Sequence, residues 1–204
     1  MRSSITIISL VAAGIAFSTI AEEVTPDKAA VKETVIPASL QTARIDIDGI
    51  KDKITLKPVK GMMTAAWMKQ QNLDNNYLHS NSKVLNGEVW EDMEVSFIPD
   101  KDGVVILYLM GAYYKPKDEK TNIPIWVQFD EVMITGAELK NGGFETVDNN
   151  GKVANWSLNG ELIKGKAQTG DNSVKVWTNK RASQAVNVTK DQLVTIKAKV
   201  KKAE

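Results

Sequence analysis

The sequence predicts an all-β fold, an antiparallel β-sandwich or barrel, on three observations. Short stretches of alternating apolar and polar residues recur along most of the chain. Gly, Asn, Asp or Pro bounds each stretch, as in turns between strands. No long amphipathic helical pattern interrupts the series. The 43% of hydrophobic residues and the six prolines are those of a folded globular protein.

Residues 1–21 predict a secretory signal peptide. Arg2 supplies a positive charge, the run from Ile5 to Ile20 is apolar, and Ala21 provides a small residue at the cleavage position. The alternative is an N-terminal membrane anchor, but the run is short for a full bilayer span. We therefore expect a secreted, periplasmic or cell-surface protein without a membrane span in its mature chain.

The composition excludes several classes of function. The chain has 204 residues with 26 Lys and Arg against 25 Asp and Glu, and cleavage after Ala21 removes Arg2, which leaves the mature chain formally neutral. Net charge therefore gives no attraction to nucleic acid or to an anionic membrane. Because Cys is absent, the chain has no disulfide framework, no Cys-ligated metal and no Cys nucleophile.

The mature chain is predicted to contain one domain after a short leader. Residues 22–40 are polar and contain two prolines, so they are interpreted as a linker or loosely ordered leader. Residues 41–204 are expected to form a single β-sandwich, because a chain of this length suffices for one core. The alternative is a division into two smaller domains near residues 137–140.

The first part of this domain predicts two short strands and a loop. The strands are expected around Ile45 and Ile54, on either side of Asp48-Gly49. Residues 62–73 are compatible with a helical turn or a strand. Residues 74–86 are rich in Asn and Ser and predict a long loop, in which the one histidine, His79, would be a solvated side chain.

Residues 88–98 predict the clearest strand. The turn residues at 99–103 connect them to residues 104–110, so the two segments are predicted to pair as a hairpin. Residues 104–110 are apolar on both faces, which suits a central strand. The alternation of residues 88–98 places Val89, Met93, Val95 and Phe97 on the inner face, and Trp90, Asp92, Glu94 and Ser96 on the outer face.

Residues 125–135 alternate in the same way, and the strands after them are shorter. The inner face is predicted to carry Ile125, Val127 and Phe129, and the outer face Trp126, Gln128 and Asp130. Residues 139–145 break the pattern. Further strands are predicted around Trp156, Leu162, 174–177, 185–188 and 193–200.

Several short motifs resemble jelly-roll carbohydrate-binding modules, the accessory domains of many xylanases and cellulases. Residues 141–145 (Asn-Gly-Gly-Phe-Glu), followed by Asn155-Trp156, are similar to the opening of such a module. Residues 170–176 and the Gln-x-Val-x-Val string at 184–188 are similar to its next segments. Residues 127–132 (Val-Gln-Phe-Asp-Glu-Val) are similar to its closing strand. The resemblance implies an antiparallel β-sandwich of the jelly-roll, galactose-binding-like type.

The motifs stand in an unusual order, because the closing motif precedes the opening one. A circularly permuted single jelly roll would explain this order, and permutation is tolerated where termini lie close together at the surface. The alternative is a small domain followed by a partial second one. We favour permutation, since residues 141–204 alone would make a small core.

The resemblance also implies a structural calcium. In such modules calcium is commonly held by the Glu of the opening motif and the Asp of the closing strand, which correspond here to Glu145 and Asp130. Two carboxylates do not complete a calcium site, so backbone oxygens would have to supply the remaining ligands. The alternative is that both residues are ordinary polar side chains at strand ends.

Aromatic residues on polar faces suggest a sugar-binding surface. Such a ring is either a binding platform or is covered by a loop, and neighbouring amide and carboxylate groups would bind the sugar hydroxyls. Loop aromatics after a central strand are further candidates. The predicted ligand-binding residues are Trp90, Trp126, Trp177, Asp92, Gln128, Tyr113 and Tyr114, whereas Trp67 and Trp156 are assigned to the core.

These observations favour a secreted, non-catalytic carbohydrate-binding protein whose partner is a polysaccharide or glycan. The first alternative is a structural or protein-interaction sandwich of the cell envelope, because one fold serves both purposes. A small glycoside hydrolase, which needs two carboxylates across one cleft, is the third hypothesis. No catalytic residue is predicted, and the identity of the glycan and the oligomeric state are left open.

Overall fold

The computed structural model describes residues 36–61, 77–117 and 120–203, and Val35–Glu204 form one compact unit. The predictions for the signal peptide and for residues 62–73 lie outside the described residues, as does Trp67. Most of the predicted leader lies outside them too, and its described end contains a single 3₁₀ turn at Ala38–Leu40.

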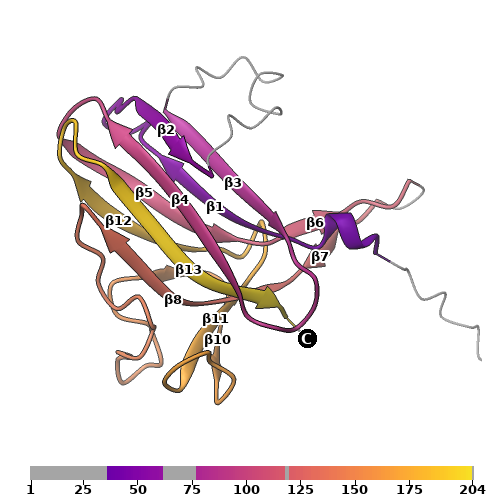
Figure 1. Cartoon of the computed structure of the whole chain (residues 1–204). Helices are drawn as coiled ribbons and strands as arrows, with labels where there is room; N and C mark the ends of the chain where they lie inside the picture. Colours follow the sequence, from indigo (N-terminus) through magenta and orange to yellow (C-terminus); the bar gives the residue numbers. More distant parts are fainter. Residues whose placement is uncertain (1–35, 62–76, 118–119, 204) are drawn as a thin grey trace, which may run out of the picture. The chain divides into compact units, whose positions relative to one another are not determined.

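Two antiparallel sheets pack face to face, which confirms the predicted β-sandwich (Figure 1). Sheet A contains, in spatial order, β3 (Leu78–Val84), β1 (Thr42–Asp48), β5 (Gly103–Met110), β12 (Ala182–Val188) and β9 (Ser157–Leu158). Sheet B contains β10 (Glu161–Lys164), β11 (Asn172–Val176), β8 (Val127–Thr135), β13 (Val194–Lys202), β4 (Glu91–Pro99) and β2 (Leu56–Lys60). A small third sheet pairs β6 (Ala112–Tyr114) with β7 (Ile123–Ile125).

The core is made by alternate residues of both sheets, as the period of two along a strand requires. In β13, Val194, Ile196, Ala198 and Val200 are buried, whereas the lysines between them point outward. The apolar β5 lies between β1 and β12, which confirms the prediction of a central strand. The largest fully buried side chains are Phe97, Phe129, Phe144, Ile45, Ile47, Ile54, Leu56, Leu107, Leu109 and Ile196.

Strands from the two halves of the chain alternate within each sheet. β12 pairs with β5 in sheet A, and β13 lies between β8 and β4 in sheet B, where Figure 1 shows it in yellow. Residues before and after 137–140 are therefore hydrogen-bonded neighbours in both sheets. The permuted order relative to the resembled modules stays a prediction.

The predicted hairpin between residues 88–98 and 104–110 is wrong. β4 pairs with β13 and β2, whereas β5 pairs with β1 and β12, so the turn at 99–103 carries the chain from one sheet to the other. The inner faces of β4 and β5 contact each other across the core instead of sharing hydrogen bonds. The prediction for Val89 also fails, because this residue precedes β4 and is 72% exposed.

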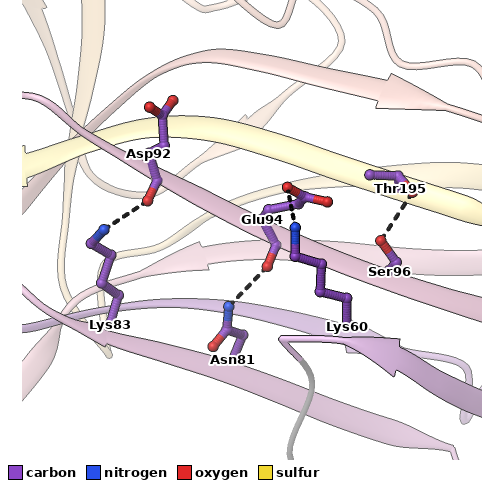
Figure 2. Close-up of polar contacts among 7 residues, drawn as sticks. All are labelled: Lys60, Asn81, Lys83, Asp92, Glu94, Ser96 and Thr195. Carbon is purple, nitrogen blue, oxygen red and sulfur yellow. Dashed lines mark hydrogen bonds and ion pairs between the residues drawn. The ribbon is translucent and has the colours of Figure 1, made fainter.

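The predicted loop at 74–86 is also wrong, because it contains the edge strand β3. His79 is buried there and is not a solvated side chain. β2 pairs with β4 only as far as Ser96, so the earlier carbonyls of β4 lack a backbone partner on that edge. Figure 2 shows two β3 side chains reaching them: Lys83 donates to the carbonyl oxygen of Asp92 (2.8 Å) and Asn81 to that of Glu94 (3.2 Å).

These contacts close one open edge of the sandwich. An unpaired strand edge invites pairing with another chain, and inward-pointing polar or charged side chains prevent it. Lys83 also forms an ion pair with Glu91 (3.2 Å), and Lys60 pairs with Glu94 (2.9 Å), which lowers the pKa of the Glu94 carboxyl. The inner face of β3 is polar because it serves this edge, and for that reason it lacks the apolar alternation of a strand.

The motif at residues 141–145 folds as a tight loop that packs on β8. Asn141 has a positive φ of 54°, and its side chain bonds the backbone of Thr146 and Ala154 while its carbonyl accepts the indole N–H of Trp156 (3.0 Å). Phe144 is buried against Trp156, with ring centroids 5.1 Å apart, and the assignment of Trp156 to the core is confirmed. The Gly142 carbonyl accepts from the N–H of Val132 (3.0 Å).

The two glycines of this motif provide a test of the packing. A Cβ at Gly142 would lie inside contact distance of the Val132 carbonyl oxygen, whereas one at Gly143 would meet only the Glu145 Cγ at 3.8 Å. We expect Gly142→Ala to lower the free energy of unfolding by at least about 2 kcal/mol, because the backbone of β8 must move. Gly143→Ala, the matched control, should change it by less than about 1 kcal/mol. Urea denaturation would measure both, and equal losses would show that the loop does not pack closely on β8.

Candidate functional site

An open groove of about 370 Å³ lies on the outer face of sheet A. Ile45 and Ile47 of β1 point into the core, so the alternate residues of the strand point out; in β5, Leu107 and Leu109 do the same for their neighbours. The antiparallel register sets Asp46 opposite Tyr108. This sheet A groove is lined by Arg44, Asp46, Asp48, Leu78, Tyr108, Met110, Thr178, Asn179 and Arg181.

A buried charge pair forms part of the groove. Asp46 is 4% exposed, and its Oδ2 accepts a hydrogen bond from the Arg44 Nη2 at 2.6 Å while its Oδ1 accepts one from the Ser80 hydroxyl at 2.5 Å. Burial raises the pKa of the Asp46 carboxyl, and the positive charge of Arg44 opposes that rise. With both oxygens occupied, the carboxylate and the guanidinium are held in fixed positions.

A tyrosine and a second arginine complete the groove. The Arg181 guanidinium lies 4.3 Å from the centre of the Tyr108 ring, and Asn179 precedes it in the exposed β11–β12 loop. The groove thus contains two arginines and two aspartates, so its formal charge is balanced. It offers donors, acceptors and one aromatic ring, which suits a neutral ligand with many hydroxyl groups.

Most of the residues predicted to bind ligand lie on the outer side of sheet B. Trp126 and Trp177 contact each other edge to face, with ring centroids 6.2 Å apart. The Nζ atoms of Lys175 and Lys180 lie 5.3 and 5.8 Å from the centre of the Trp126 ring. Gln128 is on the predicted side of β8 but is only 4% exposed, and its Nε2 donates to the Ser173 hydroxyl (3.3 Å).

The remaining predicted residues fall into two places. Across β13 from Gln128, Trp90 is half-buried with the Lys201 Nζ 4.9 Å from its ring centre. Asp92 is exposed and pairs with Lys199 (2.9 Å), whose hydrogen bond lowers the pKa of the Asp92 carboxyl. Tyr113 and Tyr114 belong to β6 in the separate two-stranded sheet, where Tyr113 is 49% exposed.

Asp130 and Glu145, the predicted calcium ligands, hold the same loop. The extra residue in β8 at the register shift opposite Lys197/Lys199 is a β-bulge, where Asp130 accepts from the N–H of the following residue, Glu131 (2.7 Å). Asp130 Oδ2 also accepts from the N–H groups of residues 168 and 169, at 2.8 and 3.1 Å. Glu145 Oε1 accepts from those of residues 171 and 172, both at 3.0 Å. The two motifs therefore fasten the β10–β11 loop over sheet B.

This arrangement is not a good fit for calcium. Calcium takes six to eight oxygen ligands, whereas the oxygens of Asp130 and Glu145 accept hydrogen bonds from N–H groups, including the Asn172 side chain at 3.2 Å from Glu145 Oε2. Within the described residues, no group of three or more His, Asp or Glu is placed to hold a metal ion. Burial raises the pKa of the Asp130 carboxyl, opposed by its backbone hydrogen bonds.

Sequence reasoning missed the sheet A groove. Its residues come from β1, β3, β5 and the β11–β12 loop, which are far apart in the sequence. The alternation Arg44-x-Asp46-x-Asp48 was a usable signal, since it places three charges on one outer face of a strand. Their convergence with Tyr108 and Arg181 depends on the pairing of β5 with both β1 and β12, which no local pattern specifies.

Comparison with family models, with curated proteins and with solved structures gives no match. Among the residues that the structure describes, no helix is long and apolar enough to cross a membrane. The function is therefore argued from the two faces of the sandwich.

The role of Asp130 and Glu145 can be tested by melting the protein with and without a calcium chelator. We expect an unchanged midpoint, because hydrogen bonds to N–H groups hold the loop. A midpoint that falls with chelator and recovers with added calcium would contradict this and support the calcium site. Glu145→Ala should lower the free energy of unfolding by about 1 to 2 kcal/mol, as two backbone N–H groups lose their acceptor. Glu138→Ala, which removes an exposed pair with Lys140 at 3.7 Å, is the matched control with little effect.

Proposed function

We propose that the protein is a secreted, non-catalytic carbohydrate-binding β-sandwich that binds a neutral segment of a glycan in the sheet A groove. The observation that carries the proposal is the groove itself, in which balanced charges and a tyrosine ring share one concave surface. The apolar signal-peptide pattern of residues 1–21 supports export to the periplasm, the cell surface or the medium.

The fixed pair in the groove suits recognition of hydroxyl groups. A sugar hydroxyl both donates and accepts, so it can bond to a carboxylate and a guanidinium that lie side by side. Arg44 and Asp46 are already ordered by their mutual bond, so binding need not order them again. The Tyr108 ring offers an apolar surface to the C–H face of a sugar when Arg181 moves aside or rests on the sugar edge.

The same contacts favour binding over catalysis. A glycosidase uses one carboxyl group as acid and a second as base or nucleophile. Asp46 has both oxygens engaged by Arg44 and Ser80, and Asp48 Oδ1 accepts from the N–H of Ile50 at 2.8 Å. Both carboxylates of the groove thus have structural hydrogen bonds, which supports a role in positioning.

A glycan array, followed by calorimetry on the best glycan, tests the proposal. The variant Asn179→Ala/Arg181→Ala removes an amide and a cation from the exposed side of the groove, so we expect the dissociation constant to rise about tenfold. The control Lys190→Ala/Gln192→Ala removes the same kinds of group from the exposed loop after β12, and should bind like the wild type.

Three outcomes would contradict the proposal. If no glycan is retained, the alternative of a structural or protein-interaction sandwich is favoured. If both variants bind like the wild type, the sugar lies elsewhere. If the bound oligosaccharide is cleaved during incubation, the protein is a glycosidase and the assignment as non-catalytic fails.

A further inference from the structure

The end of sheet B that carries Trp126 is strongly basic, although the chain as a whole is nearly neutral. Trp126, Trp177, Lys166, Lys175 and Lys180 gather there and are called the basic platform. Lys201, one strand away, adds a further positive charge over Trp90. The acidic side chain paired with this group is Glu161, at 3.9 Å from Lys175, a distance at which an exposed ion pair contributes little.

A small cavity opens beside the Trp126 ring. It measures about 70 Å³ and is lined by Gln128, Ile163, Lys166, Lys175 and Ala203. This is more than one water molecule needs and is comparable to a carboxylate group with its first waters. Gln128, which is buried, supplies an amide to the cavity wall, and Lys175 joins the cavity to the ring of Trp126.

Two features favour an anionic ligand over a neutral one. Two ammonium groups already lie near the Trp126 ring, so a neutral sugar that stacks there must displace cations without replacing their interaction. A ligand that carries its own negative charge can keep both lysines as partners. In addition, the Trp177 Nε1 is buried and has no hydrogen-bond partner among the described residues.

We propose that the basic platform is a second binding site, separate from the sheet A groove, for an acidic sugar of the hexuronate class. The carboxylate enters the cavity beside Gln128 and Lys175. The pyranose ring lies along the Trp126 and Trp177 edge, and Lys180 covers its outer side. The two sites together would let the protein bind a glycan that contains both neutral and acidic residues, or two chains at once.

Calorimetry with trigalacturonic acid and with its carboxyl-reduced, neutral counterpart tests the inference on the purified protein. We expect binding of the acid and about tenfold weaker binding in Lys175→Gln/Lys180→Gln, which removes two ion pairs from the site. The control Lys57→Gln/Lys197→Gln removes two exposed lysines from the same sheet away from Trp126, and should lose less than about twofold. Binding should also quench tryptophan fluorescence in the wild type.

Several results would overturn the platform. They are an unchanged affinity in Lys175→Gln/Lys180→Gln, an equal loss in the control variant, or equal affinity for the carboxyl-reduced trisaccharide. Equal binding of single-stranded DNA or of anionic lipid vesicles would also overturn it, because the site would then respond to any polyanion. The sheet A groove is judged separately, since Lys175→Gln/Lys180→Gln should keep the wild-type affinity for the neutral glycan found on the array.

Discussion

The contact of the 141–145 loop with the bulge of β8 is the interaction on which much of the structure depends. Gly142 lies directly against the backbone of Val132, and the Val132 N–H is bonded to it. This contact fixes the positions of Asp130 on the bulge and Glu145 on the loop, and these two carboxylates hold the β10–β11 loop. A chain without cysteine thereby fastens three distant segments by hydrogen bonds to buried or well-ordered groups.

The strand pattern was predictable where burial decides the residue type. In β4, β8 and β13 one face contacts the core, so Met93, Phe129 and Ile196 follow the period of two and the strands are visible in the sequence. The outward direction of Trp126 and Gln128 follows from the same period. Their burial does not, because the β10–β11 loop that covers this part of sheet B comes from a different part of the chain.

The errors arise where a strand serves something other than the core. β3 carries His79, Asn81 and Lys83 on its inner side because it closes the edge beside β4, so its sequence resembles a loop. The turn at 99–103 has the composition of a hairpin turn, yet both strands beside it have apolar inner faces that pack across the core. Composition cannot separate these two uses of a turn, since each needs the same glycine and polar residues.

The turn between β11 and β12 explains how two different binding surfaces can share one small sandwich. Trp177 and Lys180 exchange two backbone hydrogen bonds of 3.0 Å, which holds the turn tightly. Trp177 and Lys180 face the aromatic cluster of sheet B, whereas Asn179 and Arg181 line the groove of sheet A. Alternate residues of one turn thus supply opposite faces of the molecule. The charge differs between the faces because Asp46 and Asp48 stand near the arginines of the groove, while the lysines around Trp126 are paired with Glu161 at a distance. Local charge balance, and not the neutral total, therefore sets which ligand each face can bind.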